Sequence, residues 1–425
     1  MNTLSNARSL AICTGPIRSM RSVSAVAQSQ VNANTAEDLK SFDDIPRPKK
    51  FKFMRAFMPG GEFYNASIVD YTTALRKRYG DIFILPGMFG RPDWVTTFST
   101  KDIETVFRNE GIWPVRDTFE SLVYFRKHVR PDVYGEVQGL TSSQNEEWGK
   151  LLDFQPSMWK VVSTPTYRKM MKALNGSLDV ALKLLKESQD DLEKRRQAGE
   201  KINSNSMMER LMEIDPKVAV VMGLDTLFAG VDATSTLLSA VLLCLSKHPE
   251  KQTKLREELL KIMPTKDTLL NEETMKDMPY LRAVIKEAIR YYPNSLGTMR
   301  SCQNDVVLSG YNVPKGTTVL LGSNVLMKDS TFYSRPEEFL PERWLRDPET
   351  GKKSQVSPFT FLPFGFGPRM CIGKRIVDLE IETSVAKLIR NFQVEFNRDA
   401  SKPYKTMFIM EPAIPFPFKF TDIDN

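Results

Sequence analysis

The sequence is poor in cysteine and histidine, the side chains that most often bind zinc and iron directly. Its 425 residues include four cysteines and two histidines. Zinc and non-haem iron sites usually need two or three histidines or clustered cysteines, so sites of these kinds are nearly excluded. The cysteines lack the dense pairing of a disulfide framework, which indicates a reducing compartment. If the protein holds a metal, we predict that a lone thiolate binds it; the candidates are Cys13, Cys244, Cys302 and Cys371.

A strong charge of one sign is also absent. The 59 basic and 52 acidic residues leave a formal charge of +7, a small excess for a chain of this length. No basic stripe interleaved with aromatic residues is present, so nucleic acid is not an expected partner. A local basic face for an acidic protein remains compatible with this composition.

The start of the chain contains neither acidic residues nor lysine. Residues 1–36 carry Arg8, Arg18 and Arg21 among serines, alanines and asparagines. This composition is typical of a mitochondrial presequence, with an ordinary disordered tail as the alternative. The apolar run of about 7–15 residues in a secretory signal is missing, as are the about 20 apolar residues of a membrane anchor. We therefore predict a presequence at 1–36 and one folded domain at 37–425.

Hydrophobic periodicity predicts a chain dominated by helices, with short strands near both ends. The expected fold class is mainly α with small β-sheets. The polar and aromatic stretch 111–145 is predicted to be irregular. The main expected helices span 101–109, 166–197, 206–247, 280–292 and 372–392, and the expected strands span 82–85, 94–98 and parts of 305–321.

One segment, 218–246, is apolar enough to be mistaken for a membrane span. Asp225 and Asp232 are seven residues apart in it, so they share a helix face with Ala229. Two unpaired carboxylates would be costly inside a bilayer. We therefore expect a buried helix whose small and acidic face lines a polar cavity, in preference to a membrane span.

The most informative stretch is PFTFLPFGFGPRMCIGKRIVDLEIE. It places Phe364, Gly367, Arg369, Cys371 and Gly373 at the spacing F-x-x-G-x-R-x-C-x-G. Cys371 directly precedes a predicted helix, where free N–H groups and the helix dipole favour a thiolate over a thiol. Considered alone, such a cysteine is more often a buried structural residue in a Gly-rich turn than a ligand. The five matched positions argue against that alternative, and together they resemble the cytochrome P-450 superfamily of haem-thiolate monooxygenases.

This resemblance implies a cytochrome P-450 fold with haem b (iron protoporphyrin IX) as the cofactor. Cys371 would be the axial ligand of the haem iron, and its thiolate would push electron density that favours O–O cleavage. Arg369 and Arg300 would pair with the haem propionates. Phe364 would shield the sulfur from water, and the two glycines of the motif would permit close backbone approach.

A second motif of the family lies upstream of the cysteine. Glu287 and Arg290 are three residues apart, on one face of a predicted helix. Arg343 follows in FLPERWL. The resemblance implies that these three residues form a buried network that holds the fold together and takes no part in catalysis.

The segment AGVDATS, residues 229–235, resembles the oxygen-activating motif of the family. Gly230 would leave room for dioxygen and substrate, and Asp232 would take part in proton delivery. The family usually has a threonine at the position that Ala233 holds here. Thr234 follows, but one residue rotates a helix by about 100 degrees. Thr234 or a water molecule would therefore have to take over the role of the threonine.

The presequence-like start and the basic pair after the cysteine motif resemble the mitochondrial class, and in particular its insect xenobiotic-metabolising members. Such enzymes receive electrons from an acidic mitochondrial ferredoxin that an NADPH-dependent reductase reduces. Arg282, Lys286, Lys374 and Arg375 match cations that would dock this ferredoxin, with ordinary solvated cations as the alternative. The implied reaction inserts one atom of dioxygen into a small apolar substrate, an insecticide-like xenobiotic or a steroid. The implied location is the matrix side of the inner mitochondrial membrane, with peripheral membrane association.

The chain departs from the family near residues 148–156. Family members normally carry W-x-x-x-R there, with the arginine on a propionate, whereas Trp148 is followed here by Leu152. About 80–100 residues are absent by comparison with the family, more than loop variation explains. Their loss would expose apolar core and threaten haem retention. Two alternatives therefore stay open: an incomplete fold with poor haem binding and no activity, and a haem-thiolate isomerase or lyase that needs no electron donor.

Overall fold

The computed structural model describes most of the chain. The described residues are 39–87, 92–111, 114, 120–135, 165–199, 207–346, 349–351, 357–399, 401–406 and 410–423. Their α-helices are α2 (Lys50–Ala56), α3 (Ile68–Tyr79), α4 (Thr100–Arg108), α5 (Glu120–Tyr124), α6 (Pro131–Tyr134), α7 (Pro165–Gln197), α8 (Met207–Ile214), α9 (Pro216–Lys247), α10 (Pro249–Ile262), α11 (Pro279–Tyr291), α12 (Ser323–Leu326) and α13 (Lys374–Asn391). Their strands are β1 (Ile82–Leu85), β2 (Trp94–Thr97), β3 (Thr298–Ser301), β4 (Val306–Leu308), β5 (Tyr311–Val313), β6 (Thr318–Leu321), β7 (Phe392–Glu395), β8 (Tyr404–Thr406), β9 (Met410–Pro412) and β10 (Lys419–Asp422). The predicted presequence at 1–36 and the predicted gap near 148–156 lie outside the described residues.

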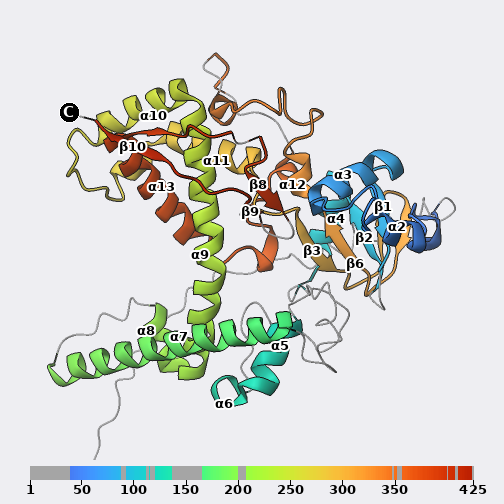
Figure 1. The fold of residues 1–425 in the computed structure, drawn as a ribbon, viewed down its shortest axis with the longest axis horizontal. Helices are drawn as coiled ribbons and strands as arrows, with labels where there is room; N and C mark the ends of the chain where they lie inside the picture. Colours follow the sequence, from blue (N-terminus) through green and yellow to red (C-terminus); the bar gives the residue numbers. More distant parts are fainter. Residues whose placement is uncertain are drawn as a thin grey trace, which may run out of the picture.

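The long helix α9 runs through the middle of the molecule (Figure 1). Helices α10, α11 and α13 lie around its C-terminal half, while α5 to α8 lie at its N-terminal half. The largest sheet has the strand order β1-β2-β6-β3 and forms a separate layer with α3 and α4. The remaining strands form three two-stranded sheets. The predicted class, mainly α with small sheets, is confirmed.

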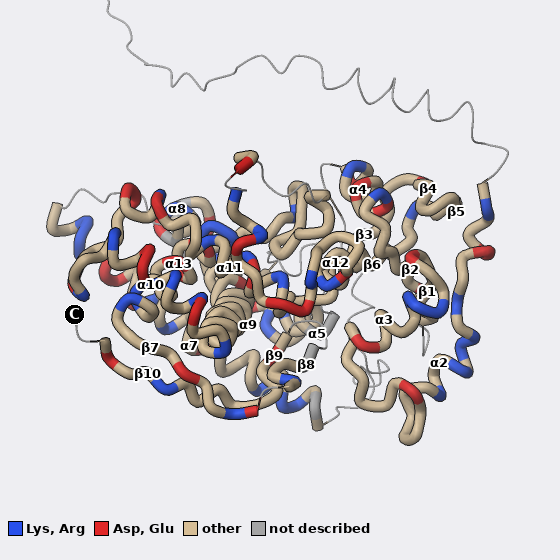
Figure 2. Tube along the Cα trace, turned by 90° about the horizontal axis from the view of Figure 1, so that it is seen from above, with Lys and Arg blue, Asp and Glu red and all other residues tan. Residues whose placement is uncertain are grey.

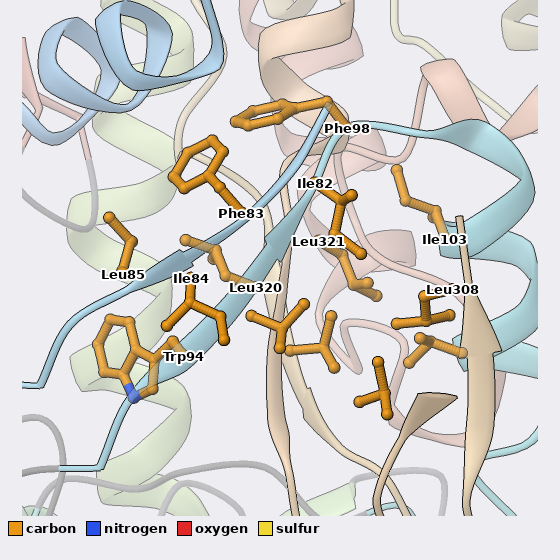
Figure 3. Packing of buried hydrophobic residues seen from close by; sticks show 14 of the residues in the cluster. Ile82, Phe83, Ile84, Leu85, Trp94, Phe98, Ile103, Leu308, Leu320 and Leu321 are labelled. Carbon is orange, nitrogen blue, oxygen red and sulfur yellow. The ribbon is translucent and has the colours of Figure 1, made fainter. Parts of the chain in front are cut away.

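The four-stranded sheet is buried on both faces along β1. All four side chains of this strand, Ile82 to Leu85, are buried in one apolar cluster, and Figure 3 shows them pointing alternately to its two sides. Strand β2 pairs antiparallel with β1 and parallel with β6. The short polar strand β3, which the sequence did not predict, pairs with β6 through positions such as Arg300 and Val319. Tertiary pairing therefore creates β3, and β3 in turn places Arg300.

Helix α3 shows how local sequence sets the limits of an element. Ser67 accepts a hydrogen bond from the N–H of Asp70 at 3.1 Å, and the Asp70 carboxylate accepts one from the N–H of Ser67 at 3.3 Å. This reciprocal pair satisfies two N–H groups that have no partner inside the helix. The helix ends at Gly80, whose φ of +92° suits glycine.

The single helix predicted over 206–247 is two helices, and that prediction was wrong. The chain breaks at Asp215, whose backbone is extended and whose side chain accepts a bond from the N–H of Lys217 at 2.8 Å. Pro216 then starts α9, because proline lacks the N–H that would continue α8 and suits the first helical position.

The described part of 111–145 is helical where an irregular chain was predicted. It contains α5, a π-helical turn at Phe125–Val129 and α6. Burial explains the difference, because Phe125 and Tyr134 pack against α7 and α9 in a small core of their own. Tertiary contacts here override a weak local preference.

Helix α9 is, among the described residues, the one long and apolar enough to cross a membrane by length and composition. Its C-terminal half is nevertheless packed inside the molecule, since Val241 and Leu245 lie in one cluster with Leu281 and Ile381. These contacts place that half of α9 in the protein core.

An acid-stability prediction follows from Glu342, which receives bonds from Lys251 at 3.2 Å and Lys254 at 2.9 Å. Burial acts to raise the pKa of Glu342, but these lysines and a backbone N–H lower it to about 2. An unfolded glutamate has a pKa of about 4.3. The stabilisation is therefore present above about pH 4.3 and is lost as the pH falls towards about 2. Glu342→Gln should flatten the acid limb of the urea-unfolding free energy between these values. Exposed Glu257→Gln is the control, and equal acid limbs for the two variants would contradict the prediction.

Candidate functional site

The cysteine loop lies between a short helix at Pro358–Thr360 and α13, and its backbone is held by local hydrogen bonds. The N–H of Cys371 donates to the carbonyl of Phe364 at 2.9 Å. Gly367 has a φ of +77°, a region that favours glycine. A Cβ on Gly367 would also come within 2.4 Å of Oε1 of Glu110. Cys371 is free and exposed, so the loop presents one thiol just ahead of α13.

The structure changes two details of the predicted loop. Helix α13 begins at Lys374, two residues later than predicted. Gly373 has an ordinary φ of −77°, and a Cβ there would be 3.8 Å from Sγ of Cys371, a normal contact. The backbone therefore requires glycine at Gly367, and Gly365 shares the need with its φ of +74°. The sequence did not single out Gly365.

Arg300 and Arg369, the two predicted propionate contacts, lie near one buried carboxylate. Arg300 is 1% exposed and donates from Nε to Oε2 of Glu110 at 2.5 Å. Its guanidinium carbon lies 5.2 Å from the centre of the Phe107 ring. Arg369 is half-buried and donates from Nε to the carbonyl of Pro114 at 3.1 Å. The sequence did not reveal Glu110, an acidic residue just after a helix without any distinctive pattern.

The charges of this cluster affect one another. Burial raises the pKa of the Glu110 carboxyl, while Arg300 and Arg369 act to lower it. Burial, followed by repulsion from Arg300, lowers the pKa of Arg369, and Glu110 acts to raise it. Two guanidinium groups and one carboxylate therefore share a poorly solvated site, where charge interactions are strong.

Glu287, Arg290 and Arg343, which were predicted to form a network, are in contact. Both Glu287 oxygens accept bonds from Arg290 at 2.9 Å. Arg343 donates to Oε1 at 3.0 Å, and the indole N–H of Trp344 donates to Oε2 at 2.8 Å. Arg290 donates further to the carbonyls of Met327, Pro336 and Glu338. Because Glu287 and Arg290 have no exposed area, this network ties α11 to the segment 327–344.

Residues 229–235 of α9 lie where α9 passes between its two groups of neighbours. Asp232 is exposed, and Gly230 and Thr234 are half-buried. Asp225 is buried and ion-paired with Arg126. The expectation that Asp225 and Asp232 share a polar cavity was therefore wrong. A step of seven residues keeps the two carboxylates on nearly the same side of α9, but the neighbours differ along the helix, so Asp225 packs against Arg126 and Asp232 faces solvent.

Three of the four predicted docking cations line one cavity of about 410 Å³ between α11, α13 and the cysteine loop; they are Arg282, Lys286 and Lys374. Arg282 pairs with Glu382 at 3.1 Å, and Lys374 pairs with a carboxylate one turn along α13 at 2.5 Å. Figure 2 shows acidic residues interspersed with basic ones along these elements. The positive charge of this face is therefore smaller than four cations would suggest.

This cavity does not contain the cysteine thiol. Its lining includes Phe364, whose ring lies 5.4 Å from Nζ of Lys374. Cys371, Arg300 and Arg369 are not among its lining residues. The cavity therefore lies beside the cysteine loop and is not lined by the thiol or by the two arginines.

The donor set fits iron that is held mainly by a porphyrin. Among the described residues, no three His, Cys, Asp or Glu side chains gather into a site for a bare ion. One exposed thiol can supply a single ligand, and a porphyrin would supply four more. Arg300 and Arg369 carry the planar donors that pair well with carboxylates such as propionates. The predicted arginine position at Leu152 lies outside the described residues.

Comparison with known proteins gives a family and close relatives. Residues 124–420 match the model of the cytochrome P450 family. The chain is 65% identical to "Probable cytochrome P450 12d1 proximal, mitochondrial" of Drosophila melanogaster, over 100% of both chains. It is 36% identical to "Cytochrome P450 CYP12A2" of Musca domestica, over 94% of each chain.

The alignment with the Drosophila protein spans 521 positions, whereas this chain has 425 residues. At least 96 positions of the alignment are therefore gaps in this chain. The sequence identity of 65% is high enough to assign the chain to the same family. Enzymes of this family are haem b-dependent monooxygenases, which confirms the predicted cofactor and enzyme class. This chain belongs to the cytochrome P450 family.

Proposed function

We propose that this chain derives from a mitochondrial monooxygenase that inserts one atom of dioxygen into a small apolar substrate, a xenobiotic or a steroid. The single observation that carries the proposal is the free, exposed Cys371 in a loop closed by its own N–H and the carbonyl of Phe364. When bound, haem b supplies the redox chemistry that activates dioxygen. The residues of the chain would position the cofactor, exclude water and deliver protons.

Cys371 would be the axial ligand. The bond to Phe364 fixes the backbone on which the sulfur is carried, and the first turn of α13 presents N–H groups nearby. Such N–H groups favour a negatively charged sulfur. Phe364, half-buried beside this backbone, would limit access of water to the sulfur.

Proton delivery would fall to α9. Gly230 leaves space at the helix surface, and the exposed carboxylate of Asp232 can exchange protons with water directly. Ala233 cannot donate a hydrogen bond from its side chain, so Thr234 would hold the proton at its hydroxyl. The exposure of this turn supports a leaky proton path and poor coupling of electrons to product.

An acidic mitochondrial ferredoxin, reduced by its NADPH-dependent reductase, would supply electrons. Arg282, Lys286 and Lys374 surround one cavity, and Arg375 is exposed close by on α13. Cations at the rim of an interface mainly raise the association rate and make it depend on salt. The Drosophila relative is named as mitochondrial, and residues 1–36 have the composition of a presequence. We place the enzyme at the matrix side of the inner membrane, with peripheral association.

The shortened chain favours a second reading, in which this form binds haem poorly and lacks activity. The 96 or more positions without a residue support an internal loss. Leu227 and Val231 on α9 are 53% and 62% exposed, and Ile372, next to the cysteine, and Leu379 on α13 are 66% and 56% exposed. Leu227 and Val231 are one turn apart on α9, and an exposed apolar face of this kind is expected to have a covering segment. A haem-thiolate isomerase or lyase remains a third reading, which independence from ferredoxin would support.

The carbon monoxide spectrum tests the thiolate ligand. The haem-loaded chain, reduced and exposed to carbon monoxide, should show the red-shifted Soret band of thiolate ligation, and Cys371→Ala should lose it completely. Cys244→Ala is the matched control, because this buried cysteine sits in the core of α9 and should leave the band in place. A band that persists in Cys371→Ala would contradict the ligand assignment. A wild-type chain that takes up no haem would support the inactive form.

A further inference from the structure

We propose that Glu110 is an internal counter-ion for the two predicted propionate-binding arginines: it bonds Arg300 directly and offsets the charge of the nearby Arg369 until a carboxylate-bearing porphyrin arrives. The inference rests on the proposed function only in assuming that the cofactor carries carboxylates. It concerns Glu110, which belongs neither to the cysteine motif nor to the buried network around Glu287.

Arg300 already has a partner in the cofactor-free chain. Arg300 and Glu110 are 1% and 2% exposed at their side chains, and their bond is 2.5 Å long. Arg300 also donates from Nη1 to Oγ1 of Thr298 at 3.0 Å and to the carbonyl of Met299 at 2.9 Å. The guanidinium is therefore held in one orientation by its own strand and by Glu110.

Glu110 also reaches the cysteine loop. Its Oε1 lies so close to Gly367 that a Cβ there would be 2.4 Å away. Gly367 begins the short helix Gly367–Arg369 that carries the second arginine. The carboxylate of Glu110 thus lies between the strand of Arg300 and the helix of Arg369.

Among the described residues, the hydrogen bonding of the Glu110 carboxylate is incomplete. Oε1 of Glu110 is buried and has no hydrogen-bond partner within the described part of the chain. A buried carboxylate oxygen without a donor is costly. Glu110 therefore pays this cost to neutralise a guanidinium that would otherwise be buried with its charge uncompensated.

The net charge of Arg300, Arg369 and Glu110 determines how strongly the cluster attracts a carboxylate. Two guanidinium groups and one carboxylate leave a single positive charge in the cluster, which suits one added carboxylate. Without the charge of Glu110 the cluster would carry two positive charges and would attract carboxylates more strongly. Glu110 thus stabilises the cofactor-free chain and weakens the attraction for a propionate. It acts as a positioning residue, through the arginines.

Metal-free porphyrins test this without using iron, Cys371 or enzyme activity. We would titrate the chain with protoporphyrin IX and with its dimethyl ester, followed by porphyrin fluorescence, and take the ratio of the two affinities. In Glu110→Gln the preference for the diacid should rise by about tenfold, and the melting temperature of the porphyrin-free chain should fall. Glu258→Gln is the matched control, since Glu258 is a half-buried carboxylate that caps α11 through Tyr280 and Leu281. It should leave the ratio unchanged.

A second variant keeps the proposal testable if Glu110→Gln does not fold. Arg369→Gln leaves the neutral Arg300–Glu110 pair intact, so the preference for the diacid should disappear. A diacid preference that is unchanged or lower in Glu110→Gln would overturn the proposal, as would a preserved preference in Arg369→Gln. Neither result bears on the thiolate ligand, which the carbon monoxide spectrum tests separately.

Discussion

Glu287→Gln is expected to lower the free energy of unfolding by about 3–5 kcal/mol, the typical loss when one partner of a buried ion pair is removed. Glutamine keeps the shape of glutamate but removes the negative charge. Arg290 and Arg343 would then share the core without a carboxylate. The N–H of Leu340 and the indole of Trp344 would also lose a charged acceptor. Urea unfolding followed by circular dichroism measures the loss.

The matched control for this prediction is Glu338→Gln. Glu338 pairs with Arg335 at 3.2 Å, and both side chains are more than half exposed. Exposed pairs contribute about 0–1 kcal/mol, so this variant should unfold almost like the wild type. The two variants thus compare the loss of a buried paired carboxylate with the loss of an exposed one. If Glu287→Gln and Glu338→Gln unfolded at the same urea concentration, the network would not hold the fold together.

Asp225→Asn is expected to cost about 3 kcal/mol, again because a buried charge loses its partner. Asp225 pairs with Arg126, and the guanidinium of Arg126 lies 5.2 Å from the centre of the Tyr134 ring. The pair joins the π-helical turn at Phe125–Val129 to the N-terminal half of α9. The effect should be local, so limited proteolysis should cut the segment 120–135 faster in the variant.

The same helix offers the control. Asp215 caps the start of α9 by accepting a bond from the N–H of Lys217. Asparagine caps helices about as well as aspartate, so Asp215→Asn should change stability and proteolysis very little. Equal proteolysis of the two variants would show that the Asp225–Arg126 pair does not anchor the segment.

Contacts between residues close in sequence were accessible to prediction. Glu287 and Arg290 meet because a step of three residues keeps them on one helix face, and the Ile82–Leu85 strand follows from its unbroken apolar run. The lone cysteine and the spacing around it predicted the family, the cofactor and the enzyme class, which the comparisons confirm. The roles of Cys371, Arg300, Arg369 and the α9 residues stay predictions.

Contacts between residues far apart in sequence could not be predicted from the sequence. Strand β3 is too short and polar to be recognised, and it exists because it pairs with β6. The helical form of the described residues within 111–145 and the solvent exposure of Asp232 likewise depend on which neighbours are packed there.

By itself, the sequence determined the class of fold, several of the longer helices, the cysteine loop and the membership of the family, because these depend on periodicity and on the spacing of neighbouring residues. Only the tertiary structure decided which charges meet. Glu110 and Arg300 are 190 positions apart, and no local pattern marks them as partners. Their pairing results from where the chain brings α4, β3 and the cysteine loop together, where burial makes an unpaired charge too costly to leave alone.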